Sequence, residues 1–137
     1  MECDMKRLHG KSALITGAAR GIGYGFAERY IAEGATVAIA DVNFDAATAA
    51  ATMLGAGAYP VAMDVTSQAS IDAAIGTVVS HAGKLDILIN NAALFDASRT
   101  VDITRASYDT LYAVNVAGTL FTMQAAARQM VRQGHGG

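Results

Sequence analysis

Hydrophobic and polar positions alternate along the chain in a regular order of short apolar runs and longer mixed segments. The apolar runs are rich in branched residues and are bounded by turn residues, which predicts buried strands. There are four of them: Ser12–Thr16, Thr36–Ala40, Tyr59–Met63 and Leu85–Asn90. Strands that are apolar at nearly every position indicate a parallel sheet that is covered on both faces.

The segments between these runs have the spacing of helices. Helices are predicted over Gly21–Glu33, Phe44–Leu54 and Ser67–His81, followed by a loop to Thr104 and a long helix from about Ser107 to Gln133. Strands and helices that alternate in this way form right-handed crossovers on a doubly wound sheet. We therefore expect an α/β fold of the Rossmann type that ends after its fourth β-α unit.

Composition is consistent with one compact domain over residues 1–137. The chain is 53% hydrophobic and 16% charged, so it can bury a core and is not of the disordered class. The formal net charge of −2 supplies no positive field for a phosphate backbone, so no nucleic-acid partner is expected. The pattern predicts no metal site.

The single cysteine, Cys3, excludes a disulfide within the chain and favours a reducing compartment. The first ten residues lack the apolar core of a secretory signal, so a cytoplasmic location is expected. The uncharged stretch 110–127 has the length of a short membrane span, but it contains Asn115, Gln124 and Gly118. We expect a helix buried between protein surfaces there, and no membrane insertion.

A glycine-rich turn follows the first strand directly. Gly17, Gly21 and Gly23 lie between that strand and the first helix. Glycine permits a tight turn and lets a pyrophosphate approach the first amides of the helix. Glycines at such short spacing also occur in ordinary strand-to-helix turns. The strand before the turn, the helix after it and an acidic residue at the end of the next strand favour a dinucleotide site.

That acidic residue is Asp41, which lies 24 positions after Gly17. A carboxylate at this place can accept hydrogen bonds from both hydroxyls of an adenosine ribose and would repel a 2′-phosphate. Asp41 therefore favours NAD over NADP as the cofactor. Arg20 is a weaker indication in the other direction, because its guanidinium could pair with a phosphate. A role for Asp41 as a helix cap is the alternative.

With these features in view, the sequence resembles the short-chain dehydrogenase/reductase family from about Lys6 to Gly137. The spacing Thr16-Gly17-Ala18-Ala19-Arg20-Gly21-Ile22-Gly23 matches the glycine motif of that family. Three further motifs follow in the family's order: Asp64-Val65, Asn90-Asn91-Ala92-Ala93, and Asn115 within Val114–Gly118. The segments 90–96 and 114–124 are similar to bacterial polyol dehydrogenases of the sorbitol and galactitol type.

The resemblance implies a role for each matching residue. The pyrophosphate would be held by Gly17, Arg20, Gly21, Ile22 and Gly23, and the adenosine ribose by Asp41. Asp64 and Val65 would flank the adenine, and Asn91 and Ala92 would lie beside the cofactor ribose, with Asn91 also steadying the sheet. Asn115 is the catalytic candidate, since its carbonyl would anchor a water of the proton relay. As alternatives, Asp64 and Asn91 could cap local turns, and Asn115 could be a polar residue at a helix kink that is satisfied by water.

Two departures from the family pattern concern Ala93 and the amino terminus. Ala93 replaces the usual glycine of the Asn-Asn-Ala-Gly motif and adds a methyl group near the cofactor. Met5-Lys6-Arg7-Leu8 resembles the usual opening of the family, so residues 1–4 are expected to be an extension.

The reactive groups of the family have no match in these 137 residues. The family uses a Ser together with a Tyr four positions before a Lys, but none of the five tyrosines is followed by Lys at that spacing. We therefore expect this chain to be the amino-terminal, cofactor-binding part of a dehydrogenase that acts on a polyol or ketose, and to be inactive alone. A non-catalytic fragment that binds NAD or an adenine nucleotide, or that associates with a full-length homologue, is the alternative.

The last helix carries apolar residues on more than one side. In the family this helix packs in a subunit interface, so the resemblance implies a homo-oligomer. Without later strands, Phe121, Met123 and Met130 are expected to be exposed.

Overall fold

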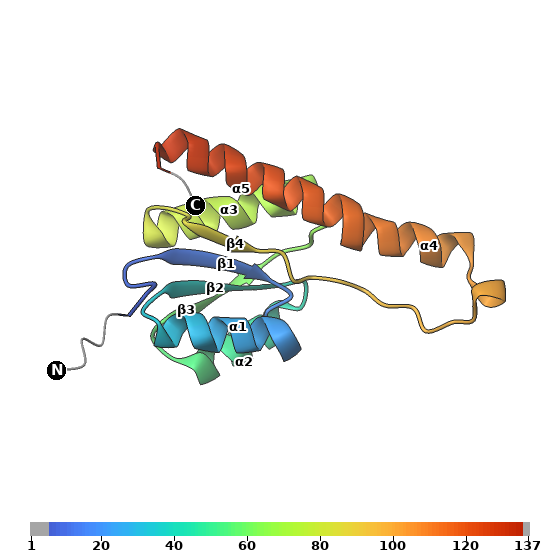
Figure 1. Cartoon of the computed structure of the whole chain (residues 1–137), viewed down its shortest axis with the longest axis horizontal. Coiled ribbons are helices and arrows are strands. Elements are labelled where there is room, and N and C mark those ends of the chain that lie inside the picture. Colours follow the sequence, from blue (N-terminus) through green and yellow to red (C-terminus); the bar gives the residue numbers. More distant parts are fainter. Residues whose placement is uncertain (1–5, 136–137) are drawn as a thin grey trace.

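The computed structural model describes residues 6–135, which form one four-stranded parallel sheet with helices on both faces (Figure 1). The strands are β1 (Ser12–Thr16), β2 (Thr36–Asp41), β3 (Ala58–Ala62) and β4 (Ile87–Ile89). Their order in the sheet is β3-β2-β1-β4, and all three pairings are parallel. The predicted Rossmann-type α/β fold is thus confirmed. The expected extension 1–4, which includes Cys3, lies outside the described residues.

Two helices cover each face of the sheet. Helices α1 (Gly21–Ala32) and α2 (Phe44–Leu54) lie on one face, and α3 (Gln68–Ala82) and α5 (Thr119–Gln133) lie on the other (Figure 1). This arrangement follows from the order of the strands, because the chain crosses one face of the sheet from β1 to β3 and the other face from β3 to β4.

Each face of the sheet has its own apolar core, as alternation along the strands requires. Ala13 and Ile15 of β1 pack with the buried alanines of α1 and α2, whereas Leu14 packs against α3 and α5. All three side chains are fully buried. The many alanines let the helices approach the sheet closely, and each buried leucine or isoleucine contributes about 1.5–3 kcal/mol to stability.

The fourth strand is shorter than the predicted Leu85–Asn90. Leu85 and Asp86 are buried but lie before the strand, and Asp86 binds the start of β1 from both its main chain and its side chain. The Asp86 amide donates to the Ser12 carbonyl at 2.9 Å, and the Ser12 amide donates to the Asp86 carboxylate at 2.8 Å. The carboxylate thus takes the place of a main-chain acceptor, and regular pairing begins at Ile87.

The long final helix is divided by a π-helical turn, which the sequence did not predict. Helix α4 (Arg105–Tyr112) starts two residues earlier than expected and has Thr104 as its N-cap. The π turn Ala113–Gly118 then connects α4 to α5. Helix α4 extends beyond the sheet and contains no buried residue (Figure 1).

Three apolar residues of α5 were expected to be exposed, and this prediction is confirmed for two of them and wrong for the third. Phe121 and Met123 are exposed, but Met130 is partly buried because it packs against the core between α3 and the sheet. Within the described residues, no helix is both long enough and apolar enough to cross a bilayer.

Candidate dinucleotide-binding site

The sequence-predicted site residues gather at the carboxyl ends of the strands. The order β3-β2-β1-β4 reverses between β1 and β4, and a crevice opens at such a switch point in doubly wound sheets. Thr16 ends β1, and Asn91 follows β4. These two residues connect the two strand ends directly.

A reciprocal set of hydrogen bonds joins Thr16 to the segment after β4. The Thr16 hydroxyl accepts from the amides of Asn91 and Ala92, each at 3.0 Å. In return, the Asn91 side-chain amide donates to the carbonyls of Thr16 and Gly17, each at 3.1 Å. Each such bond contributes about 1 kcal/mol. The predicted steadying role of Asn91 has this geometric basis.

Gly17 and Gly23 have no room for a side chain, because atoms of neighbouring residues lie too close to them. Gly17 has φ of +62°, and a Cβ there would lie 3.0 Å from the Cα of Ala92. At Gly23 a Cβ would lie 2.6 Å from the Asn91 side-chain nitrogen and 2.7 Å from the Gly17 carbonyl oxygen. By contrast, a Cβ at Gly21 would meet nothing within 4 Å, so the space in front of that residue is open.

The start of α1 differs from the starts of the other helices that follow loops. Asn43, Ser67 and Thr104 cap α2, α3 and α4 by accepting from a main-chain amide of the first turn. Arg20, at the N-cap of α1, provides no such side-chain bond. The first amides of a helix have no partner within the helix. The amino end of α1 therefore offers N–H groups and a positive dipole end to an anion.

Asp41 lies at the end of β2, beside the glycine loop. One of its carboxylate oxygens accepts from the Ala19 amide at 3.3 Å, and the other accepts from the Asn43 amide at 3.0 Å. Asn43, not Asp41, provides the side-chain cap of α2, so the cap alternative for Asp41 is wrong. A carboxylate has about four acceptor positions, so Asp41 can accept further donors.

Asp64 and Val65 follow β3, next to the end of β2. One oxygen of Asp64 accepts from the amide and the hydroxyl of Thr66, at 2.9 and 2.6 Å. The Thr66 hydroxyl, followed by its amide, lowers the pKa of Asp64 below its ordinary value. The alternative prediction, that Asp64 caps a local turn, is therefore confirmed for that oxygen. Val65 is half-buried, and a Cβ on Gly118 would lie 2.8 Å from its Cγ2 atom.

Asn115 lies in the π turn and binds the segment that follows Asn91. Its side-chain oxygen accepts from the Leu94 amide at 2.8 Å, and its side-chain nitrogen donates to the Leu94 carbonyl at 2.8 Å. Asn115 thus lies at a helix irregularity, as the alternative of a polar residue at a helix kink predicted, but the main chain of Leu94 supplies two of its hydrogen bonds. The proposed role of its carbonyl in a proton relay stays a prediction.

Hydrogen bonds of Asp96 attach the loop that follows Asn91 to helix α4. The Ser107 hydroxyl and the Ser98 amide both donate to the Asp96 carboxylate. The Ser107 hydroxyl, with a smaller effect from Ser98, lowers the pKa of Asp96 to about 2. Asn115 and Asp96 together fix the course of a loop that has no regular partner strand on its outer side.

Sequence reasoning missed two contributors to this site. The hydroxyl of Thr16 organises the end of β4, and a Thr at the carboxyl end of a buried strand was the available signal. The main chain of Leu94 is the partner of Asn115, but no sequence signal marks a main-chain group.

An open parallel sheet with a glycine turn and an uncapped helix at its switch point defines a nucleotide-binding α/β protein of the Rossmann class. Residues 11–137 match the family model of the short chain dehydrogenases. The chain therefore belongs to the short chain dehydrogenase family.

Two relatives are named as dehydrogenases of sorbitol and of galactitol. The chain is 59% identical to a sorbitol dehydrogenase of Cereibacter sphaeroides and 47% identical to a galactitol 2-dehydrogenase of Agrobacterium fabrum. In both cases the match covers 96% of this chain and 51% of the relative. The chain thus spans about half the length of the curated relatives it matches.

Solved structures show the same architecture. A short-chain type dehydrogenase/reductase from Mycobacterium marinum superposes with a TM-score of 0.91 and 36% identity, over 98% of this chain and 56% of that chain. A 3-ketoacyl-(acyl-carrier-protein) reductase from Brucella melitensis, complexed with NADH, superposes with a TM-score of 0.88 and 35% identity. That match covers 93% of this chain and 52% of the reductase.

Gly23→Ala tests the close packing of the glycine loop. The added methyl group has no room between Asn91 and the Gly17 carbonyl, so we expect a loss of about 1–3 kcal/mol in unfolding free energy. Gly25→Ala is the matched control, because a Cβ on Gly25 meets nothing within 4 Å in the same helix. That variant should gain up to about 1 kcal/mol, as helix propensity dictates. Urea unfolding measures both, and equal effects of the two variants would contradict the packing role of Gly23.

Acid titration tests the tie between Asp96 and α4. Since the folded pKa of Asp96 is lowered, the tie is complete above the ordinary carboxyl pKa of 3.8 and is lost as the pH falls through about 2. NMR shifts of the Ser98 and Ser107 amides should therefore report a midpoint near 2. In Ser107→Ala the midpoint should move up toward the ordinary value. A midpoint that is the same in both proteins would exclude the Ser107 hydroxyl as its cause.

Proposed function

We propose that this chain is the cofactor-binding half of an NAD-dependent oxidoreductase that acts on a polyol or another secondary alcohol. The observation that carries the proposal is the uncapped amino end of α1 at the switch point of the sheet, beside an open space at Gly21. In dinucleotide-binding proteins of this class, that position holds the pyrophosphate. Gly17, Gly21, Ile22 and Gly23 would supply the amides, and Arg20, which is exposed, would add positive charge.

Asp41 supports a preference for NAD over NADP. Its carboxylate lies at the end of β2, where its bonds to the Ala19 and Asn43 amides fix its orientation. A fixed anion at this position accepts from ribose hydroxyls and opposes a 2′-phosphate. The Brucella melitensis reductase, which shares the fold, is described as complexed with NADH. Asp64, with one oxygen outside the Thr66 turn, and Val65 would flank the adenine, and Asn91 and Ala92 would lie beside the second ribose.

The substrate class rests on the relatives. Sorbitol dehydrogenase and galactitol 2-dehydrogenase both have names that specify a sugar alcohol, and they match 96% of this chain. A bound nicotinamide would accept the hydride that leaves such an alcohol carbon. Because these 137 residues contain no Tyr-x-x-x-Lys, the groups that handle the alcohol proton would lie in the rest of the whole protein.

A homo-oligomer through the last helix is part of the same proposal. Leu120, Phe121 and Met123 are each 42–51% exposed on α5. Large apolar side chains that are grouped on one helix commonly mark an interface between subunits. A second copy of the same helix would bury them.

Comparison of NADH and NADPH tests the cofactor proposal. Fluorescence titration of the chain should show tighter binding of NADH than of NADPH. Asp41→Asn keeps the size and one acceptor oxygen but removes the charge, so the ratio of the two affinities should shift toward NADPH by about tenfold, or ~1.4 kcal/mol. Asp45→Asn, in the first turn of α2, is the control and should leave the ratio unchanged. Equal binding of both cofactors by the parent chain would refute the preference.

Turnover assays test the assignment of the reactive groups. The chain alone, mixed with NAD and either sorbitol or galactitol, should give no reduction of NAD above background. The sorbitol dehydrogenase of Cereibacter sphaeroides serves as the positive control. Sustained turnover by the chain alone would show that its own residues provide the proton transfer, contrary to the proposal.

A further inference from the structure

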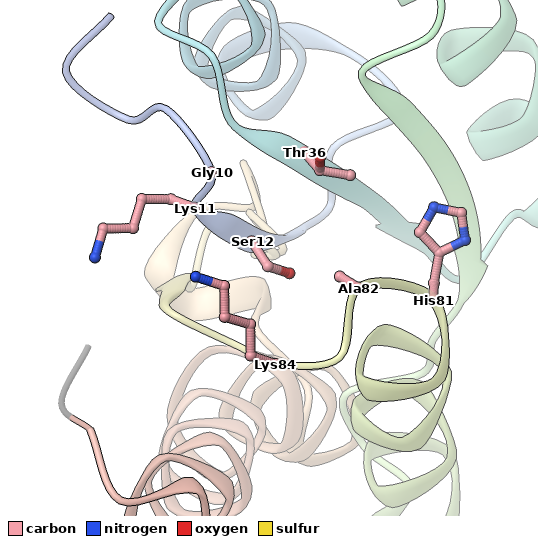
Figure 2. Close-up of a pocket in the computed structure, with 7 residues that line it drawn as sticks. All are labelled: Gly10, Lys11, Ser12, Thr36, His81, Ala82 and Lys84. Carbon is pink, nitrogen blue, oxygen red and sulfur yellow. The ribbon is translucent and has the colours of Figure 1, made fainter.

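Two cavities lie away from the cofactor site and differ in the state of their charges. The smaller one, of about 200 Å³, lies at the amino ends of β1 and β2, beside the end of α3 (Figure 2). Its Lys84 is already paired with the buried carboxylate of Asp86 at 3.0 Å. The larger one, of about 530 Å³, is a groove between α3 and α5. Within residues 6–135 the charged side chains of this α3–α5 groove form no ion pair.

The α3–α5 groove has an apolar floor and a charged rim. Ile75 of α3 and Ala125 of α5 are buried at the floor. The charged residues are Asp72 of α3 and Arg128 and Arg132 of α5, and all three are exposed. A buried apolar centre with a polar rim that carries both signs of charge is typical of a contact between proteins.

Neutral side-chain amides orient two of these charges. The Gln68 side-chain nitrogen donates to one oxygen of Asp72 at 2.9 Å, and Arg132 donates to the side-chain oxygen of Gln129 at 3.0 Å. Each amide holds its charged neighbour in one direction without neutralising it. Asp72 and Arg132 are therefore positioned side chains whose counter-charges are not supplied by residues 6–135.

Gly76 lines the groove in the middle of α3, where glycine is not required by packing within the chain. Glycine inside a helix is less favourable than alanine. A Cβ on Gly76 would meet nothing within 4 Å, so an alanine would fit there. The missing side chain instead opens the groove and permits the close approach of another surface.

The two helices run in the same direction along the groove (Figure 1). Both end near Leu85, which follows α3 closely and exchanges two hydrogen bonds with Gln133 at the end of α5. Gly76 and Arg128 lie six and five residues before the ends of their helices, and thus at about the same level.

The opposite charges lie at equal distances from this level, in opposite directions. Asp72 is four residues before Gly76 on α3, and Arg132 is four residues after Arg128 on α5. At a rise of 1.5 Å per residue, each charge lies about 6 Å from the level of Gly76 and Arg128. The groove thus carries a negative charge at one end of one helix and a positive charge at the other end of the second helix.

We propose that the α3–α5 groove binds the same groove of a second copy of this chain, about a two-fold axis that passes between Gly76 and Arg128. A two-fold rotation places each α3 on the α5 of the other copy in the antiparallel direction. It also brings each Asp72 to Arg132 of the other copy. Arg128 then lies against the other copy's Gly76, where no side chain obstructs it.

A second copy suits the groove better than an unrelated protein, because the groove contains both halves of each ion pair. The contact is also distinct from the one proposed for the apolar side of α5, since Leu120, Phe121 and Met123 do not line the groove. The two contacts can therefore be tested separately.

Sedimentation velocity of charge-reversed variants tests the groove contact. Phe121→Gln is introduced into every protein, so that the contact proposed for the apolar side of α5 does not mask the groove. This Phe121→Gln parent should form dimers. Asp72→Arg and Arg132→Asp should each raise the dissociation constant at least about tenfold, because each places like charges opposite each other.

A mixture of the two charge-reversed variants provides the decisive measurement. In the mixed pair, one copy has arginine at both positions 72 and 132, and the other has aspartate at both. Opposite charges then face each other at both ends of the groove. The equimolar mixture should therefore dimerise like the Phe121→Gln parent, although each variant alone does not.

Gly76→Gln separates association from folding. It should raise the thermal unfolding midpoint measured by circular dichroism, because glutamine favours the helix. It should also weaken dimerisation about tenfold, since its side chain fills the space opposite Arg128. Ala73→Gln is the matched control on the same helix, because Ala73 is exposed and does not line the groove, and it should leave the dissociation constant unchanged.

The outcomes distinguish the groove from the apolar side of α5. If the unmodified chain associates but the Phe121→Gln parent is monomeric up to its limit of solubility, the α5 contact holds and the groove contact is excluded. The groove proposal is also wrong if the mixture of Asp72→Arg and Arg132→Asp stays monomeric, or if Gly76→Gln dimerises like the parent. Recovery of the dimer in the mixture supports the groove whatever the effect of Phe121→Gln.

Discussion

The reciprocal hydrogen bonding between Thr16 and the Asn91 segment is the interaction on which the rest of the site depends. Strands β1 and β4 come from distant parts of the chain, and β4 pairs with β1 over only three residues. Short parallel pairing by itself leaves the strand ends free to diverge. The Thr16 hydroxyl and the Asn91 amide close this end of the sheet with four hydrogen bonds. They also fix the carbonyls of Thr16 and Gly17, from which the glycine turn starts.

The missing cap of α1 follows from the same arrangement. A side-chain cap at Arg20 would fill the space in front of the first amides, and the other helices that follow loops show that this sequence uses such caps freely. Gly23 must approach Asn91 and the Gly17 carbonyl too closely for any side chain. Asn91 therefore packs against one side of the glycine turn, while the side that faces the first amides of α1 is open. That combination suits a ligand that carries its own negative charge.

Much of this architecture could be predicted from the sequence, because its causes are local. The branched apolar runs predicted all four strands within about two residues, and the glycine spacing with Asp41 predicted the candidate site. Asn91 was identified because its motif has a fixed place after the fourth strand. The π turn at Ala113–Gly118 was not predicted, because its residues also fit an ordinary helix and the turn depends on contacts with Leu94 and Val65. Met130 was misjudged for a related reason, since the contact that buries it comes from α3 and the sheet.

The π turn connects two strand ends that the sheet itself does not bring together. Gly118 packs against Val65 after β3, and Asn115 binds Leu94 after β4. Strands β3 and β4 are the two edges of the sheet, so the π turn contacts segments that leave its two opposite edges. Such turns are frequent at functional sites, because the wider helix redirects side chains without breaking the helix. In this protein the redirected side chain is Asn115, and the loop that it fixes borders the Asn91 end of the proposed cofactor site. The π turn that positions this loop leads directly into α5, so the exposed apolar side chains of α5 and the loop beside the site belong to one continuous helical segment.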